Sequence, residues 1–219
     1  MNRPWTVALT GGIASGKTAL AALIAGARIP VVDSDAIARE LTAPGEPGAV
    51  DLRENLDPAF FGVDGALDRR RLREAMTVDP GLRRLVESLL HPLIWARLES
   101  RILAYSDASW VLCVIPLLTE VGETPASLTI DRKLVVDCNE NTQIARLIVR
   151  DRIGREGALR LLSLQSSRET RLSRADDLVV NESGLGELAA SARDLVRDYT
   201  RRSQNRTGSF PDAAPARLH

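Results

Sequence analysis

Four residues near the start of the chain have the types and the spacing of a phosphate-binding loop. The pattern G-x-x-x-x-G-K-[ST] is met by Gly11, Gly16, Lys17 and Thr18. In such a loop, backbone N–H groups and the dipole of the following helix hold phosphate oxygens. The lysine reaches the β- and γ-phosphates, and the hydroxyl ligates Mg²⁺. The pattern therefore predicts a nucleoside triphosphate site. Its expected lining is Gly11, Gly12, Ile13, Ala14, Ser15, Gly16, Lys17, Thr18 and Ala19.

The segments on either side of the loop agree with this interpretation. Residues 5–9 are apolar and β-prone, as in a buried parallel strand, and residues 19–25 are strong helix formers. The chain contains only two lysines, Lys17 and Lys133, and otherwise uses arginine as its basic side chain. A compact ammonium is what a site crowded with phosphate oxygens needs. A chance match in a Gly/Ala-rich turn is therefore disfavoured.

Length and composition limit the class of protein. A chain of 219 residues suits one α/β domain with inserted subdomains. Lys plus Arg and Asp plus Glu both number 29, which removes the simplest case for a nucleic-acid binder. Cys113 and Cys138 lie in apolar runs without C-x-x-C spacing, as core residues of a cytosolic protein do. We expect no signal peptide, because the chain enters its first strand directly, and no membrane span. The protein is expected to be cytoplasmic.

The hydrophobic pattern predicts five strands in an α/β arrangement. They are residues 5–9, 29–32, 109–115, 132–138 and 177–180. Helices are expected over residues 19–25, 33–40, 68–76, 80–90, 92–105, 140–152 and 185–200. We predict a core made of residues 1–48, 106–140 and 175–202, a helical insertion over 49–105 and a disordered tail over 203–219.

Two carboxylates follow the second predicted strand. Asp33 and Asp35 lie just beyond its carboxyl end, the edge at which α/β proteins bind ligands. Both could merely cap the helix that follows, but we expect at least one of them to act in the chemistry. Asp33 is the better candidate, since the strand fixes its backbone. Asp35 falls in the first helical turn, where it interacts with the helix dipole.

Two further groups of side chains are candidates for substrate binding. His91 precedes Pro92 between two predicted helices, although a lone histidine is more often structural than catalytic. Arg146 and Arg150 are four residues apart and project from one helix face. They start a stretch rich in Arg and Gln, residues 141–174, with little core pattern beyond Ile153.

Taken together, the motifs resemble those of the dephospho-CoA kinase family. Besides the phosphate loop, the matching pieces are residues 32–39 (VDSDAIAR), 90–94 (LHPLI), 115–120 (IPLLTE), 143–146 with 150–151, and 175–177 with Asn181. These pieces span residues 6 to about 199. The loop alone is common to many families, whereas D-x-D-x-I-A-R, H-P-L-I and P-L-L-x-E in this order are far more specific.

The resemblance implies a fold, an activity and site residues. The fold would be a nucleoside-monophosphate-kinase-like core of five parallel strands, with a helical acceptor domain and a mobile lid over 141–174. The activity would be phosphorylation of the ribose 3′-hydroxyl of dephospho-CoA by ATP with Mg²⁺, the last step of CoA synthesis. Lys17, Asp33 and Arg146 would be catalytic, and Arg146, Arg150 and Asn181 would bind ATP. The acceptor would contact Asp33, Asp35, Arg39, His91, Pro116, Leu117, Leu118 and Glu120.

The chain departs from the family pattern at two places. Ala19 stands where a second hydroxyl residue is usual, and the turn at 181–184 is one residue longer than Asn-x-Gly. Other small-molecule kinases of this fold remain an alternative, separable by substrate trials. A GTPase switch is disfavoured, because N-K-x-D is absent and the D-x-x-G spacing at 151–154 follows a helix. The intact Lys17, Thr18 and Asp33 argue against a non-catalytic ATP-binding module.

Overall fold

The chain divides into two compact units. The computed structural model describes residues 3–116, 118, 124–205 and 216–218. One unit comprises residues 1–32 and 102–219, and the other comprises residues 33–101. The second unit thus begins at Asp33, whereas the sequence predicted a helical insertion from residue 49 to residue 105. Each unit is described by itself below.

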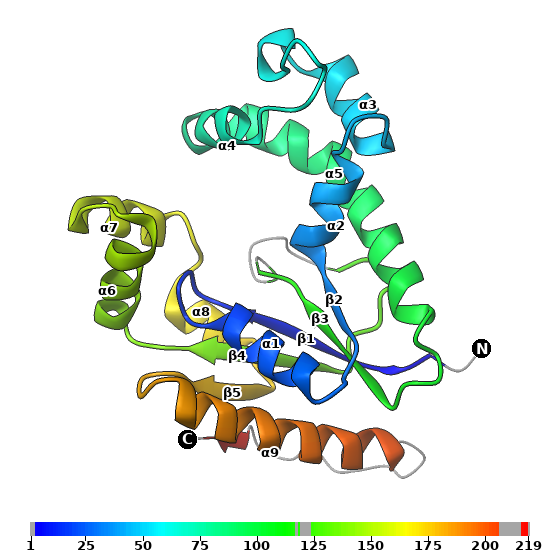
Figure 1. Cartoon of the computed structure of the whole chain (residues 1–219), viewed down its shortest axis with the longest axis vertical. Coiled ribbons are helices and arrows are strands. Elements are labelled where there is room, and N and C mark those ends of the chain that lie inside the picture. Colours follow the sequence, from blue (N-terminus) through cyan, green and yellow to red (C-terminus); the bar gives the residue numbers. More distant parts are fainter. Residues whose placement is uncertain (1–2, 117, 119–123, 206–215, 219) are drawn as a thin grey trace. The chain divides into compact units, whose positions relative to one another are not determined.

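A sheet forms the centre of the first unit, and all five predicted strands are present. They are β1 (Trp5–Gly11), β2 (Val31–Asp33), β3 (Trp110–Val114), β4 (Arg132–Asp137) and β5 (Asp177–Val180). The order across the sheet is β2-β3-β1-β4-β5-β6, where β6 is Ala216–Leu218 (Figure 1). Parallel pairing sets Leu9 of β1 beside Val114 of β3 and Leu134 of β4. The predicted fold class is confirmed.

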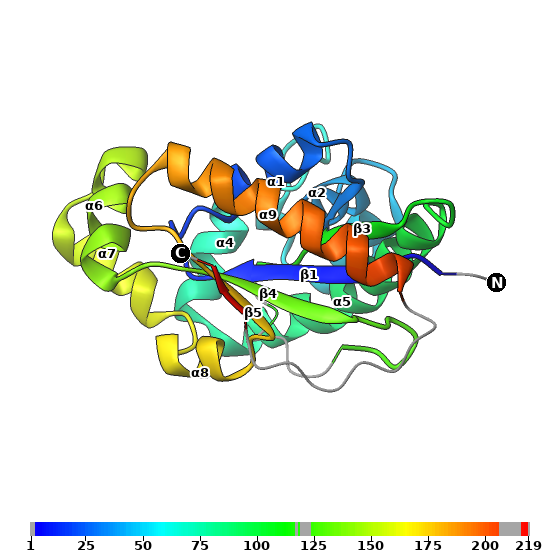
Figure 2. The same ribbon diagram turned by 90° about the horizontal axis from the view of Figure 1, so that it is seen from below.

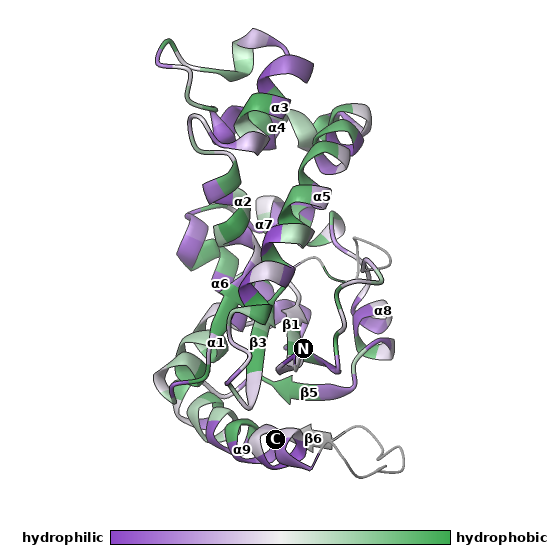
Figure 3. Cartoon of the chain, turned by 90° about the vertical axis from the view of Figure 1, so that its right-hand side faces the viewer, coloured by the Kyte–Doolittle hydropathy of each residue, from purple (hydrophilic) through white to green (hydrophobic). Residues whose placement is uncertain are grey.

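The strands are apolar because both faces of the sheet are covered. Every residue of β1 and β3 is buried, and Figure 3 shows hydrophobic colour over most of β3. Helices α1 (Lys17–Gly26) and α9 (Leu185–Gln204) lie together on one face of the sheet (Figure 2). Tyr199 of α9 is fully buried and packs edge-on against two tryptophans, with ring centroids 5.2 Å from Trp5 and 5.3 Å from Trp110. Both cysteines are buried, as expected.

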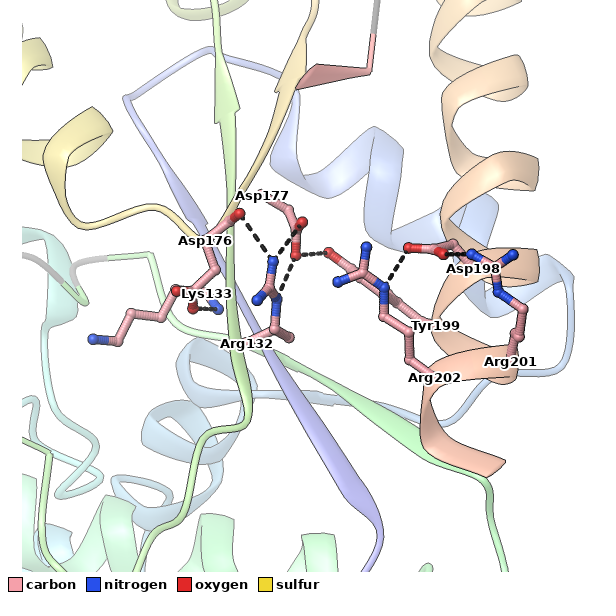
Figure 4. Close-up of polar contacts among 8 residues, drawn as sticks. All are labelled: Arg132, Lys133, Asp176, Asp177, Asp198, Tyr199, Arg201 and Arg202. Carbon is pink, nitrogen blue, oxygen red and sulfur yellow. Dashed lines mark hydrogen bonds and ion pairs between the residues drawn. The ribbon is translucent and has the colours of Figure 1, made fainter. Parts of the chain in front are cut away.

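A polar network fastens α9 to the sheet at the end where β4 and β5 begin (Figure 4). Arg132 donates from Nε and Nη2 to the two carboxylate oxygens of Asp177, both at 2.9 Å. The Tyr199 hydroxyl donates to Asp177 Oδ2, also at 2.9 Å. Burial, together with the Asp177 carboxylate, raises the pKa of Tyr199 well above its usual value, so the phenol stays protonated. The network lies at the end of the sheet where the parallel strands begin, whereas the phosphate loop follows the end of β1. We therefore assign the network a structural role.

Three helices follow β4 on the phosphate-loop side. They are α6 (Glu140–Asp151), α7 (Arg155–Ser163) and α8 (Arg168–Ser173). The Asn139 side chain caps α6 by accepting from Thr142 N at 2.8 Å. Figure 1 shows α6 and α7 as neighbouring helices.

The C-terminal prediction needs correction. A disordered tail was expected over residues 203–219, but α9 continues to Gln204, and Ala216–Leu218 pairs in parallel with β5. The reason for the pairing is that β5 would otherwise present an open edge of backbone N–H and C=O groups. The rest of that tail lies outside the described residues except Asn205.

The second unit is helical, as predicted. It contains α2 (Ser34–Leu41), α3 (Pro47–Asn55), the short 3₁₀ helix η1 (Pro58–Phe60) and α4 (Arg69–Val78). The long helix α5 (Pro80–Leu103) starts in this unit. Its apolar cluster is built on Leu52, Leu56, Leu72 and Val86. Asp68 and Asp79 cap α4 and α5 by accepting hydrogen bonds from backbone N–H groups of the first turns.

One prediction in this unit was wrong. Residues 80–90 and 92–105 were expected to be separate helices, yet α5 runs through Pro92. Proline lacks an N–H for the helix and its ring crowds the carbonyl group four residues earlier, which usually kinks or ends a helix. The buried Val86 and Leu98, one on each side of Pro92, hold both halves of α5 by apolar packing.

No helix in the described ranges is both long and apolar enough to cross a membrane.

Candidate active site

The phosphate loop joins the end of β1 to the start of α1. Ser15 N donates to Gly12 O at 3.2 Å, which closes the turn. Gly11 and Gly16 have φ of 149° and 107°, a region that favours glycine. A Cβ atom at Gly11 would lie 2.3 Å from Val136 O, and one at Gly16 would lie 2.1 Å from Asn181 Nδ2. The two motif glycines are therefore required both by backbone conformation and by space.

Lys17 and Thr18 are the two side chains of the loop to which the sequence analysis assigned chemistry. Lys17 Nζ donates to Gly11 O at 2.7 Å and to Gly12 O at 2.9 Å, so the ammonium lies across the loop. Thr18 is in the first turn of α1 and is exposed. A phosphate held by the loop would meet the ammonium, the hydroxyl and the N-terminus of α1 together.

Arg146 and Asn181 hold the outer side of the loop. Asn181 Nδ2 donates to Ser15 O at 2.7 Å, and Asn181 N donates to Asp137 O at 2.8 Å. Arg146 donates from Nη2 to Asn181 O at 2.9 Å and from Nη1 to Ala14 O and Ser15 O, both at 3.3 Å. Two residues that sequence reasoning associated with ATP are thus brought together at the loop.

Sequence reasoning did not assign the residues that hold the tip of the loop. Gln165 Oε1 accepts from Ile13 N at 2.7 Å, and Gln143 Nε2 donates to Ile13 O at 2.7 Å. Gln143 lies on α6, and Gln165 follows α7. The only sequence signal is scarcity: the chain has three glutamines, and two of them bind this one peptide unit.

Arg150, the second predicted lid arginine, is placed differently from Arg146. It is exposed, and its guanidinium donates to the neighbouring Asp151 at 2.7 and 2.8 Å. A separate ion pair links α8 to the end of β4, where Arg168 donates to the buried Asp137 at 2.6 and 3.0 Å. Neither contact involves the phosphate loop.

The start of α6 is fastened by Glu182, which also lay outside the predicted site. Its carboxylate accepts from the Thr142 hydroxyl at 2.7 Å, from Asn139 Nδ2 at 2.8 Å and from Asn139 N. Desolvation alone would raise the pKa of Glu182. The hydrogen bonds from Thr142 and Asn139 and the charge of Arg146 outweigh it, so the pKa is lowered.

In the second unit, the predicted acceptor residues lie on two helices. Asp33 is the N-cap of α2, and its Oδ1 accepts from Asp35 N at 2.8 Å and from Ala36 N at 3.4 Å. Asp35 and Arg39 are exposed on α2. His91 lies within α5 instead of between two helices, and its ring centroid is 6.4 Å from that of Trp95, one turn later.

The predicted acceptor segment after β3 is described only in part. The hydroxyl of Thr10 donates to Pro116 O at 3.2 Å, which ties this segment to β1. Leu118 is buried. Leu117 and Glu120 lie outside the described residues.

A magnesium ion would find one protein ligand at the loop. The described residues contain no group of three or more His, Cys, Asp or Glu side chains that could hold a metal ion. Thr18 offers an exposed hydroxyl oxygen, a donor type that suits this hard cation. Mg²⁺ at nucleotide sites commonly keeps several waters and binds substrate phosphates, so a single hydroxyl fits its demands.

Comparison with known proteins identifies the family. A family model described as dephospho-CoA kinase matches residues 5–187. The chain belongs to the dephospho-CoA kinase family. The dephospho-CoA kinase of Thiobacillus denitrificans is 41% identical over 202 residues, covering 92% of this chain and 98% of the relative. That of Aeromonas hydrophila is 42% identical over 183 residues, covering 84% and 88%. Members of this family are kinases, so the chain is a phosphotransferase.

Solved structures agree with that family fold. A crystal structure of a Thermus thermophilus protein superposes with a TM-score of 0.72 at 28% identity, covering 90% of this chain and 98% of the other. The dephospho-CoA kinase of Campylobacter jejuni gives 0.59 at 19% identity, covering 90% and 97%. Shikimate kinase from Acinetobacter baumannii gives 0.51 at 16%, covering 95% and 97%. The last two are similar in fold alone.

Proposed function

We propose that this chain transfers the γ-phosphoryl group of ATP to the ribose 3′-hydroxyl of dephospho-CoA, giving CoA and ADP. The observation that carries this proposal is the family match over residues 5–187, in which the phosphate loop keeps every chemical residue of its motif. We also place the protein in the cytoplasm, where thiols such as those of the buried Cys113 and Cys138 stay reduced.

The phosphate loop supplies binding and charge. Phosphoryl transfer asks the protein for positioning and charge neutralisation more than for covalent chemistry. Backbone N–H groups of residues 11–18 and the α1 N-terminus would hold the phosphates of ATP. The Lys17 ammonium, which is 2.7 Å from Gly11 O, would turn to the β- and γ-phosphate oxygens. Mg²⁺, when bound at the Thr18 hydroxyl, would neutralise charge on the same oxygens.

Asp33 is the carboxylate that we assign to the acceptor. It is the last residue of β2 and the N-cap of α2, where its Oδ1 accepts hydrogen bonds from Asp35 N and Ala36 N. A carboxylate with a fixed backbone can orient a ribose hydroxyl and accept its proton during transfer. We place Asp35, Arg39, His91, Pro116, Leu117, Leu118 and Glu120 around the acceptor, and Asn181, Arg146 and Arg150 around ATP.

Residues 141–174 remain our proposed lid. Arg150 is exposed and paired only with its neighbour Asp151 among the described contacts, so it could change partner at small cost. Arg146 already holds the loop, so we assign it to loop positioning and ATP binding together. Closure over bound ATP would exclude water from the transfer step.

A phosphorylation assay across a panel of acceptors tests this function. Purified protein with Mg²⁺ and ATP is offered dephospho-CoA, adenosine, AMP and shikimate in parallel. We expect dephospho-CoA to be the preferred acceptor by kcat/KM. A higher kcat/KM for any other acceptor would favour the alternative, another small-molecule kinase of the same fold.

A further inference from the structure

The tip of the phosphate loop is held in a demanding conformation. Ala14 has φ of 57°, the left-handed region, although it is not glycine. A residue in this region keeps its conformation only where the surrounding structure enforces it. The contacts on either side of Ala14 must therefore stabilise the loop before any nucleotide binds.

Two glutamine side chains supply such contacts at the preceding peptide. Gln165 accepts from Ile13 N and Gln143 donates to Ile13 O, each at 2.7 Å, so both polar groups of one residue are fixed. Gln143 is buried, and Gln165 is half-buried. The access of Gln143 to the loop depends on Gly12, because a Cβ atom there would lie 2.4 Å from Gln143 Nε2. The absence of a side chain at Gly12 thus makes room for the hydrogen bond from Gln143 to Ile13 O.

Apolar packing reinforces the same link. The side chains of Ile13 and Ala14 pack against the buried cluster of Ile144, Leu147 and Ala158 on α6 and α7. The loop tip is therefore packed into the apolar core between α6 and α7, in addition to its covalent connection to β1. Any shift of the segment after α7 must act on the Ile13 peptide through Gln165.

We propose that Gln165, acting with Gln143, is a positioning residue that holds the phosphate loop in its ATP-binding conformation. The two side chains keep the Ile13 peptide oriented and so support the left-handed Ala14 that follows. ATP then binds a preorganised loop, so the binding free energy is not reduced by the cost of ordering the loop. This role rests on the proposed kinase activity. Turnover by the wild-type protein tests that activity, and the variants below test the role of Gln165.

The test replaces Gln165 with methionine, which has similar length and no oxygen to accept from Ile13 N. We expect the KM for ATP to rise about 3- to 10-fold, because a change of this size corresponds to the free energy of one intramolecular hydrogen bond. The KM for dephospho-CoA and the kcat should change less than twofold. Without nucleotide, the Ile13 amide should exchange with deuterium faster in Gln165→Met, a result that requires no activity. Gln204→Met, an exposed glutamine on α9, is the matched control and should change none of these quantities.

Three outcomes would overturn this role. They are an unchanged KM for ATP, equal increases in both KM values, and unchanged exchange at the Ile13 amide. If Gln165→Met fails to fold, Gln165→Glu replaces it, because glutamate keeps an acceptor oxygen. In Gln165→Glu the Ile13 amide should therefore stay as protected without nucleotide as it is in the wild type. Faster exchange of the Ile13 amide in that variant would also overturn the role, because the acceptor oxygen is still present.

Discussion

Asn181 Nδ2 donates to the carbonyl oxygen of Ser15 at 2.7 Å, which joins the turn after β5 to the phosphate loop. Asn181 is buried, and its backbone carbonyl oxygen accepts a hydrogen bond from Arg146 Nη2. The side chain also fills the space that Gly16 leaves open, since a Cβ atom there would lie 2.1 Å from Asn181 Nδ2. One asparagine therefore fixes the loop at Ser15 and Gly16, while Lys17 bonds to Gly11 and Gly12.

Asn181→Leu should weaken both folding and ATP binding. The leucine removes the donor and leaves Ser15 O with the longer hydrogen bond from Arg146 Nη1 at 3.3 Å, so the loss should cost about 0.5–1.5 kcal/mol of folding free energy. We expect a lower Tm and a higher KM for ATP, measured by thermal unfolding and steady-state kinetics. Asn205→Leu, at the exposed C-cap of α9, is the control. An Asn181→Leu protein with wild-type Tm and KM would contradict this assignment.

Tyr199→Phe should affect stability alone. It removes the hydroxyl that donates to Asp177 Oδ2 at 2.9 Å in the polar network of Figure 4, at the end of the sheet where β4 and β5 begin. The lost hydrogen bond should cost about 1–2 kcal/mol, or a fall in Tm of roughly 2–8 °C for a protein of this size. Thermal unfolding measures this loss. A change in kcat or in either KM, beyond twofold, would show that the network also shapes the active site.

Glu182 should make the fold sensitive to acid. Its folded pKa is lowered, so its contribution to stability is present above the unfolded value of about 4.3 and is lost as the pH falls through the folded pKa. Wild type should therefore exceed Glu182→Gln in Tm near neutral pH, and the two values should converge below about pH 4. The carboxylate is exposed, so the difference should be small. A Tm difference that is constant from about pH 7 to about pH 3 would contradict a role for the charge.

Asp33→Asn should separate capping from chemistry. Asparagine caps helices as well as aspartate does, so α2 and the Tm should be preserved. The kcat should fall roughly 10²- to 10⁴-fold, the range for a positioned general base, with ATP affinity nearly unchanged. Asp35→Asn is the paired comparison and should cost less activity, because Asp35 lies in the first turn of α2. A normal kcat, or a defect confined to Mg·ATP binding, would move Asp33 from the acceptor to the metal.

The sequence predicted the five strands and the phosphate loop because these features are local. Buried strands are continuous apolar runs, and the loop motif carries its residues within eight positions, Gly11 to Thr18. The continuous helix α5 was missed because Pro92 is a strong local stop signal that tertiary packing overrides.

The contacts around the loop could not be predicted in the same way. Gln165 and Ile13 are 152 positions apart, and no spacing rule relates a glutamine after α7 to a backbone N–H. Glu182 was part of a turn that the sequence identified only as one residue too long. Its role depends on Asn139 and Thr142, which the fold brings to it across 43 and 40 positions.

The most direct test of the proposed reaction is the position of the new phosphate. Purified protein is incubated with Mg²⁺, ATP and dephospho-CoA, and the product is analysed by mass spectrometry and by ³¹P and ¹H NMR. We predict one added phosphate on the ribose 3′-oxygen with wild type. Thermal unfolding first checks that Lys17→Ala is folded. Its rate of phosphoryl transfer should then fall at least about 10²-fold, as expected when a cation is lost where charge develops in the transition state. Phosphate at another position, no transfer by wild type, or Lys17→Ala activity within a few-fold of wild type would contradict the account.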